Sequence, residues 1–81
     1  MLLLVEVADT SLAWDRGPKL ALYARHGVPE VWIVDLRGCT VDVCRQPGPG
    51  GYAERLAIAG GNLTPMLVPT LRIDVATLLG A

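Results

Sequence analysis

The sequence has no phenylalanine and little of several residue types from which binding sites are built. Its 81 residues include two cysteines, one histidine and only 19% charged residues. Cys39 and Cys44 lie five positions apart along one predicted strand, about 16 Å at the usual rise per residue, which is too far for a disulfide. Without a second Cys/His pair the sequence also argues against zinc, so two buried thiols in a reducing compartment are the simpler interpretation.

Long hydrophobic runs and an excess of positive charge are also missing. No segment approaches the ~18 consecutive apolar residues of a membrane span, and the apolar start of the chain lacks the basic leader of a signal peptide. We therefore expect a cytoplasmic protein with no membrane partner. The net charge of −1 provides no basic field for nucleic acid, although a metal ion could neutralise phosphate locally.

What the chain does contain is apolar. Hydrophobic residues make up 52% of it and the mean hydropathy is +0.43, more than a small self-sufficient domain needs. We expect surplus apolar surface that further chain or a partner covers, which makes a homodimer one candidate assembly. Because Met1 leads directly into what looks like a buried central strand, residues 1–81 are predicted to form a single partial domain whose N-terminal part is absent.

The first half of the chain predicts a βαβ unit. Leu2–Val7 shows too little alternation for a half-exposed strand and fits one covered on both faces. A helix is expected from an N-cap at Asp15, which leaves Pro18 in the first turn, where a missing N–H costs nothing. Gly27 supplies the left-handed C-terminal cap, and Glu30–Leu36 is a second strongly apolar strand.

The second half predicts antiparallel strands and a short helix. Thr40–Gln46 and Tyr52–Ile58 alternate as hairpin partners, with a flexible loop at Pro47–Gly51. Two further prolines keep the next stretch irregular or at a sheet edge. The last helix is expected at Val75–Leu79, with Asp74 as its N-cap.

Three residues near the start could carry chemistry. Glu6 is a carboxylate inside an apolar strand, which is costly to desolvate unless it meets a cation or hydrogen-bond donors. Lys19 borders the helix stripe that faces the sheet, and its long side chain could reach Glu6. Tyr23 extends this line by one helical turn, and its hydroxyl could contact phosphate or anchor the core.

Simpler roles remain open for these residues and for others. Glu6 at a strand end could form an ordinary ion pair with Arg16 or Lys19, and Lys19 could pair with Asp15 on the helix surface. His26 fits a helix C-terminus, where the dipole stabilises its charge. Three further residues are expected to serve structure: Trp14 and Trp32 in packing, and Asp35 as a turn cap.

Spaced motifs along most of the chain resemble the Uma2 family of restriction endonucleases (the DUF820 group). The motifs are Leu3–Ser11 (LLVEVADTS), Asp15–Gly17 with Lys19-Leu20 and Tyr23-Ala24, Gly27–Asp35 (GVPEVWIVD) and Val68–Leu71 (VPTL). That family is similar to the PD-(D/E)XK nucleases. The resemblance implies an α/β fold: the C-terminal part of a restriction endonuclease-like core, with a βαβ unit, antiparallel hairpin strands and a short C-terminal helix.

The resemblance also implies a site and a reaction. Glu6 matches the second acid of the family's site and Lys19 its amine, which lies here on the helix because Ala8 occupies the usual position. Glu6 and the backbone carbonyl of Val7 would bind Mg²⁺ or Mn²⁺, with Lys19 beside the attacking water, Tyr23 as a substrate contact and DNA as the partner. The first acid, which relatives carry in a Pro-Asp motif, has no counterpart after Met1.

Two functions therefore follow as hypotheses. The first is a Mg²⁺-dependent DNA endonuclease that hydrolyses phosphodiesters, inactive as this chain stands because one catalytic acid is missing. The second is a non-catalytic binding or dimerisation module that retains the nuclease-like fold and uses its apolar excess for a partner.

Overall fold

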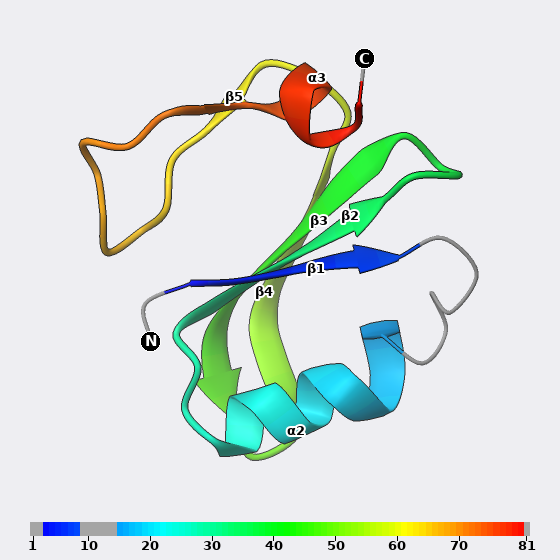
Figure 1. The fold of residues 1–81 in the computed structure, drawn as a ribbon. Helices are drawn as coiled ribbons and strands as arrows, with labels where there is room; N and C mark the ends of the chain where they lie inside the picture. Colours follow the sequence, from blue (N-terminus) through cyan, green and yellow to red (C-terminus); the bar gives the residue numbers. More distant parts are fainter. Residues whose placement is uncertain (1–2, 9–14, 81) are drawn as a thin grey trace.

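The computed structural model describes residues 3–8 and 15–80. In chain order the elements are β1 (Leu4–Ala8), the π-helical turn η1 (Asp15–Lys19), α2 (Leu20–Arg25), β2 (Glu30–Asp35), β3 (Thr40–Gly48), β4 (Gly51–Ile58), β5 (Asn62–Leu63), β6 (Ile73–Asp74) and α3 (Val75–Leu78). The first four strands form one sheet in the order β1-β2-β3-β4, and β5 pairs with β6. In Figure 1 the strand β1 lies in front, with α2 below the sheet and β5 and α3 above it.

The predicted βαβ unit is confirmed. Strands β1 and β2 are parallel, with Glu6 opposite Ile33, and the chain between them contains η1 and α2. Gly27 ends the helix with φ of 73°, and the Val28 amide donates to the Tyr23 carbonyl at 3.1 Å. This is the glycine cap that the sequence predicted.

The helical segment begins at Asp15, where the sequence placed its N-terminus, but its first turn has π-helical form and contains Pro18. Proline has no N–H to leave unpaired, so the first turn tolerates it. The wide turn itself was not predicted, because residue preferences do not distinguish it from an α-helical turn.

The hairpin of β3 and β4 is longer than predicted. We expected a flexible loop at Pro47–Gly51, which is wrong because Pro47 pairs with Tyr52 and Gly48 with Gly51. The pairing between β2 and β3 ends at Glu30 and Arg45, so the proline lies beyond the neighbouring strand and removes no ladder hydrogen bond there. Gly51 turns the chain with φ of 131°, a conformation that favours glycine.

The C-terminal part covers the face of the sheet opposite to α2. The capping role of Asp74 is confirmed, because its carboxylate accepts the Ala76 amide at 3.1 Å. The ladder of β5 and β6, in which Asn62 pairs with Asp74 and Leu63 with Ile73, was not predicted. Two-residue strands leave too short a pattern to detect.

Each face of the sheet has its own apolar core. The core beneath α2 consists of Ala8, Leu20, Ala24, Val31, Ile33, Cys44 and Tyr52. The core beneath β5, β6 and α3 consists of Trp32, Val34, Val41, Val43, Leu63 and Val75. Strand β2 supplies alternate residues to both cores and is buried along its whole length, as a strand covered on both faces should be.

Two expectations about burial are wrong in part. The first strand was predicted to be covered on both faces, but Val5 is 43% exposed and Val7 62% exposed on the face away from α2. Both cysteines are free, as predicted, but only Cys44 is buried and Cys39 is exposed.

No helix within the described residues has the length and apolar character to cross a membrane.

Candidate functional site

Glu6 lies on β1 on the side of the sheet that faces α2. It stands opposite Ile33, a residue of the core beneath α2, and its side chain is 25% exposed. The carboxylate is therefore at the margin of the covered area, in contact with water and within reach of the helix.

Lys19 and Tyr23 both contact Glu6 through the same carboxylate oxygen. The Lys19 Nζ atom lies 3.3 Å from Glu6 Oε1, and the Tyr23 hydroxyl donates a hydrogen bond to Glu6 Oε1. The two residues are four positions apart, which places them on one face of the helical segment. The structure thus brings together the three side chains that the sequence singled out, while their roles in chemistry remain predictions.

The hydrogen bond to Glu6 raises the pKa of Tyr23, with burial and the negative charge of Glu6 as further causes and Lys19 acting in the opposite direction. A tyrosine that donates to a carboxylate must stay protonated. Tyr23 is therefore a hydrogen-bond donor here at neutral pH, and it holds the Glu6 side chain in position.

The carbonyl of Val7 points away from β2. The Ala8 carbonyl accepts the Leu36 amide at 3.2 Å and so faces β2, and the backbone groups of successive strand residues point to opposite edges. The Val7 carbonyl therefore points to the edge of β1 that no described strand pairs, one residue along the chain from Glu6, and both residues offer oxygen donors of the kind that Mg²⁺ prefers.

The described residues do not by themselves bring together a full set of metal-ligating side chains. Within residues 3–8 and 15–80, no group of three or more His, Cys, Asp or Glu side chains could hold a metal ion.

Trp14 lies outside the described residues, and so does the Asp15 side chain that was one alternative partner for Lys19. Asp35 serves as the predicted turn cap, since its carboxylate accepts the Gly38 amide at 2.9 Å.

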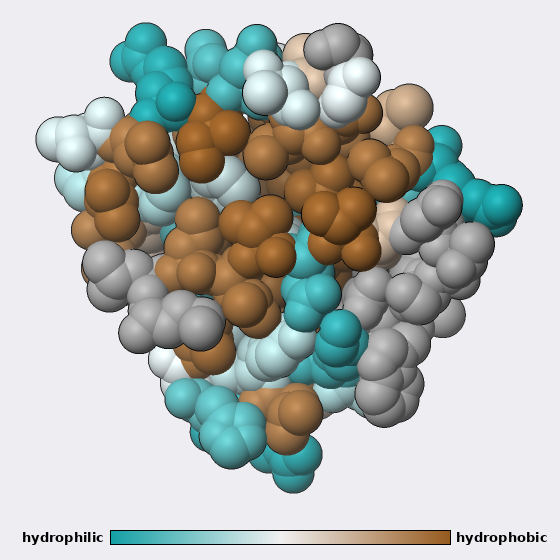
Figure 2. All heavy atoms as spheres, viewed as in Figure 1, coloured by the Kyte–Doolittle hydropathy of each residue, from teal (hydrophilic) through white to brown (hydrophobic). Residues whose placement is uncertain are grey.

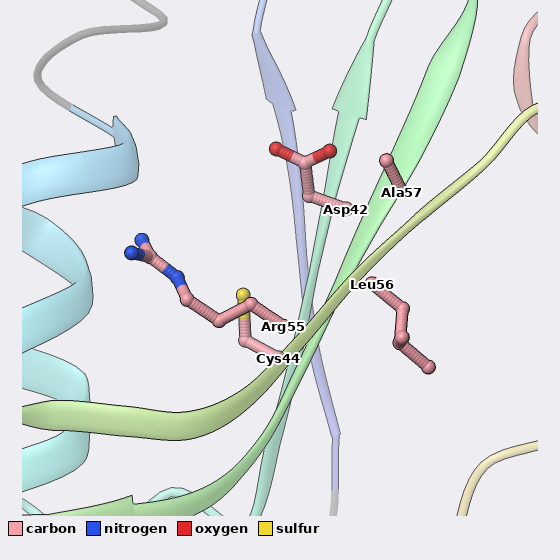
Figure 3. A pocket seen from close by; sticks show the side chains of 5 residues that line it. All are labelled: Asp42, Cys44, Arg55, Leu56 and Ala57. Atoms are coloured by element: carbon pink, nitrogen blue, oxygen red, sulfur yellow. The ribbon is translucent and has the colours of Figure 1, made fainter.

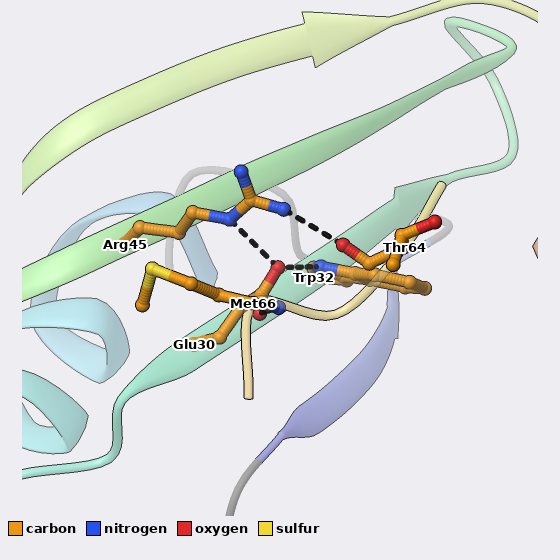
Figure 4. A network of polar contacts seen from close by, with 5 residues as sticks. All are labelled: Glu30, Trp32, Arg45, Thr64 and Met66. Atoms are coloured by element: carbon orange, nitrogen blue, oxygen red, sulfur yellow. Dashed lines mark hydrogen bonds and ion pairs between the residues drawn. The ribbon is translucent and has the colours of Figure 1, made fainter. Parts of the chain in front are cut away.

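A second polar cluster on the opposite face was missed by the sequence analysis (Figure 4). Glu30 is fully buried and accepts hydrogen bonds from the Trp32 indole at 2.7 Å, from Arg45 at 2.9 Å and from the Met66 amide at 2.7 Å. Arg45 also donates to the Thr64 carbonyl at 3.0 Å. The cluster joins the loop after β5 to the sheet. The one signal in the sequence was an acid that opens an otherwise apolar strand.

A cavity of about 390 Å³ lies along β3 and β4. It is lined by Asp42, Cys44, Arg55, Leu56 and Ala57, and Figure 3 shows the Arg55 side chain extending past Cys44 toward the helical segment. These residues belong to β3 and β4, and none of them is Glu6, Lys19 or Tyr23.

Comparison with protein-family models matches residues 1–76 to Uma2, described as a putative restriction endonuclease. The match includes Glu6, Lys19 and Tyr23, and the observed mixed α/β architecture agrees with a restriction endonuclease-like core. No curated protein gives a significant match.

Proposed function

The chain belongs to the Uma2 family, and we propose that it supplies the glutamate and lysine of a metal-dependent site that hydrolyses DNA phosphodiesters. The observation that carries the proposal is the convergence of Glu6 and Lys19, 3.3 Å apart, from a strand and a helix separated in sequence. Surface ion pairs are common, but this one lies within the family match and beside an open sheet edge.

The residues fit Mg²⁺ or Mn²⁺ in part. Glu6 and the Val7 carbonyl would hold the ion with two hard oxygen donors, and further acids must come from outside the described residues of one copy. When bound, the ion supplies Lewis acidity to the scissile phosphate and offsets its charge. This local charge is needed because the net charge of the chain is −1.

Lys19 and Tyr23 have distinct tasks in this proposal. Lys19 donates hydrogen bonds to the attacking water or to the phosphate oxygens as their negative charge grows, which lowers the barrier. Tyr23 donates to Glu6 Oε1 and so holds the carboxylate in one orientation. Tyr23 therefore acts first on Glu6, and a direct contact with the substrate is secondary.

The alternative is a non-catalytic binding or dimerisation module with the same fold. The exposed valines of β1 favour it, because Val5 and Val7 are 43% and 62% exposed side by side on one face of an edge strand. A module of this kind would bind its partner without Mg²⁺ and would leave DNA intact.

Nicking of supercoiled plasmid with Mg²⁺ or Mn²⁺, by this chain and by a version extended upstream of Met1 that would supply the missing acid, separates the two functions. If the endonuclease proposal holds, Glu6→Gln and Lys19→Ala each lower the nicking rate by about 100-fold or more, and a chelator abolishes it. Matched controls are Glu54→Gln on β4 and Arg25→Ala at the end of α2, which change the same charges away from the site. Equal rates for Glu6→Gln and Glu54→Gln in the extended version would contradict the proposal, and absence of metal-dependent nicking in the extended version as well would favour the alternative.

A further inference from the structure

The cavity along β3 and β4 lies on the same face of the sheet as Glu6. Asp42 pairs with Ile33 of β2, and Ile33 pairs with Glu6 of β1. Side chains of residues paired across neighbouring strands lie on the same face, so Glu6, Ile33 and Asp42 form one row across the sheet. Because neighbouring strands are about 4.8 Å apart, the backbone of Asp42 lies about 10 Å from that of Glu6.

Asp42 and Arg55 bring opposite charges to this cavity. Asp42 is half-buried on β3, and Arg55 is exposed on β4, where it pairs with Cys44 of the core beneath α2. In Figure 3 the side chains of Asp42 and Arg55 extend from the same side of the sheet, while Leu56 points the other way. The Cys44 thiol and Ala57 complete the lining. A carboxylate and a guanidinium therefore stand together at a cavity with apolar walls.

The cavity does not depend on the edge of the sheet at β1. All of its lining residues lie on β3 and β4, which stand at the other end of the sheet order. Figure 2, which views the molecule with β1 in front as in Figure 1, shows hydrophobic residues gathered across the β1 side. A polar ligand finds paired donors and acceptors at the β3–β4 end instead.

The two charged groups limit which ligand fits. The Asp42 carboxylate repels an anion, and the Arg55 guanidinium repels a cation. A suitable ligand donates hydrogen bonds to the carboxylate and accepts them from the guanidinium. Both side chains already interact within the protein, so the ligand must supply both kinds of contact in exchange.

A nucleobase has this pattern of donors and acceptors, and guanine has it most completely. Its O6 and N7 atoms accept a bidentate pair of hydrogen bonds from arginine, and its N1–H and 2-amino groups can donate to a carboxylate. The volume of about 390 Å³ falls within the usual range for small-ligand pockets, about 300–1,000 Å³. Because base pairing occupies N1–H in a duplex, only an unpaired guanine can use both edges.

We propose that the cavity binds one unpaired guanine of the DNA substrate, with Arg55 and Asp42 at its polar edge and Ala57 against the ring. This inference rests on the proposed function and adds a base preference to it. At a rise of about 3.4 Å per nucleotide, the distance of about 10 Å from Asp42 to Glu6 corresponds to about three nucleotides. The guanine therefore lies close to the phosphate that Glu6 and Lys19 would act on.

The first test is DNA binding without metal, measured by fluorescence anisotropy in EDTA at low salt. The probes are labelled single strands of about 12 nucleotides, one of thymine alone and one with a single central guanine. The chain should bind the guanine strand about 10-fold more tightly, and annealing each strand to its complement should remove this preference. Equal affinity for the two single strands, or binding to neither, overturns the proposal.

Two matched pairs of variants test the cavity. Arg55→Ala should abolish the preference for guanine, whereas Arg72→Ala, next to β6, removes the same charge elsewhere and should preserve it. Ala57→Leu fills the cavity from an exposed position and should also abolish the preference, while Ala76→Leu on α3 should not. If Arg55→Ala weakens binding to both strands by the same factor, Arg55 contacts phosphate alone and the proposal is overturned. A preference that Ala57→Leu leaves intact also overturns it.

Hypoxanthine in place of guanine tests the role of Asp42. This base keeps O6, N7 and N1–H but lacks the 2-amino group, so the wild-type chain should bind it more weakly than guanine. Asp42→Ala removes the acceptor and should bind the two strands equally. A difference that persists in Asp42→Ala would mean that the amino group has another partner, and the proposed arrangement would be wrong.

These outcomes distinguish this inference from the proposed function. If the extended version nicks DNA with Mg²⁺ and neither it nor the chain prefers guanine, the base site is overturned and the endonuclease proposal stays intact. If the chain prefers guanine and the extended version never nicks DNA, the base site is supported and the endonuclease is contradicted.

Discussion

Glu6 and Glu30 lie in the same sheet and have similar partners, but Glu6 is partly exposed and Glu30 is buried. Each pairs with a cationic side chain and accepts a hydrogen bond from an aromatic residue: Lys19 and Tyr23 for Glu6, Arg45 and Trp32 for Glu30. Glu30 is fully buried and both of its carboxylate oxygens accept hydrogen bonds. The Glu6 side chain is 25% exposed, and its contacts with Lys19 and Tyr23 both fall on Oε1.

The difference shows how a carboxylate is committed to structure or left available for a ligand. A buried charge must have every partner supplied by the fold, because water cannot replace a missing one. A carboxylate at the sheet margin can exchange a contact for a cation at low cost. Burial therefore separates the two glutamates better than the identity of their partners.

The largest effect is expected for Glu30→Ala. This change leaves the Trp32 indole, Arg45 and the Met66 amide without their buried acceptor, and breaking a buried pair in this way costs about 3–5 kcal/mol. Urea unfolding followed by circular dichroism measures the loss. Glu6→Ala is the matched control and should cost far less. A loss below that of Glu6→Ala would mean that the buried network adds nothing to stability.

Trp32→Phe should have the next largest effect. It removes the indole N–H that donates to Glu30 at 2.7 Å while Arg45 and the Met66 amide remain, and a hydrogen bond to a charged group contributes about 1.5–3 kcal/mol. The double variant with Glu30→Ala isolates this bond from lost packing. If the two losses are additive, the indole acts through its apolar contacts alone.

The sequence predicted the order of the main elements because their signals are local. Gly27 at the helix end, Asp74 at the start of α3 and the apolar run of β2 each depend on neighbouring residues. The β3–β4 turn was predicted less well, because the tolerance of Pro47 depends on where β2 ends. That information lies in the strand register and not in the nearby residues.

The candidate site was predictable in the same uneven way. Glu6 stood out as an acid in an apolar strand, and Lys19 and Tyr23 followed from helical spacing. The Glu30 network was not found, because its partners lie 15 and 36 positions away. The exposure of Val5 and Val7 was missed for a related reason: a run of leucine and valine predicts burial, and nothing local tells which face of the strand is covered.

A smaller effect on stability is expected for Glu6→Gln. The ion pair with Lys19 is partly exposed, and such pairs contribute at most about 1 kcal/mol. The unfolding temperatures of the variant and the wild type should therefore be nearly the same. The small difference between them should shrink as the salt concentration increases. A loss comparable to that of Glu30→Ala would show that Glu6 is a structural residue, and the comparison between the two glutamates would fail.

The smallest effect is a shift in the titration of Tyr23, which tests the hydrogen bond that orients Glu6. The chain has two tyrosines, so in a Tyr52→Phe background the tyrosinate absorbance reports Tyr23 alone. Its pKa is raised chiefly by the hydrogen bond to Glu6, so Glu6→Gln should lower this pKa toward 10. Because the folded-state pKa is the higher one, the stabilisation is complete below the pKa of unfolded tyrosine and is lost as pH rises through the folded value. An unchanged titration in Glu6→Gln would mean that Tyr23 does not hold the carboxylate, and Glu6 would then lack the aromatic donor that Trp32 provides for Glu30.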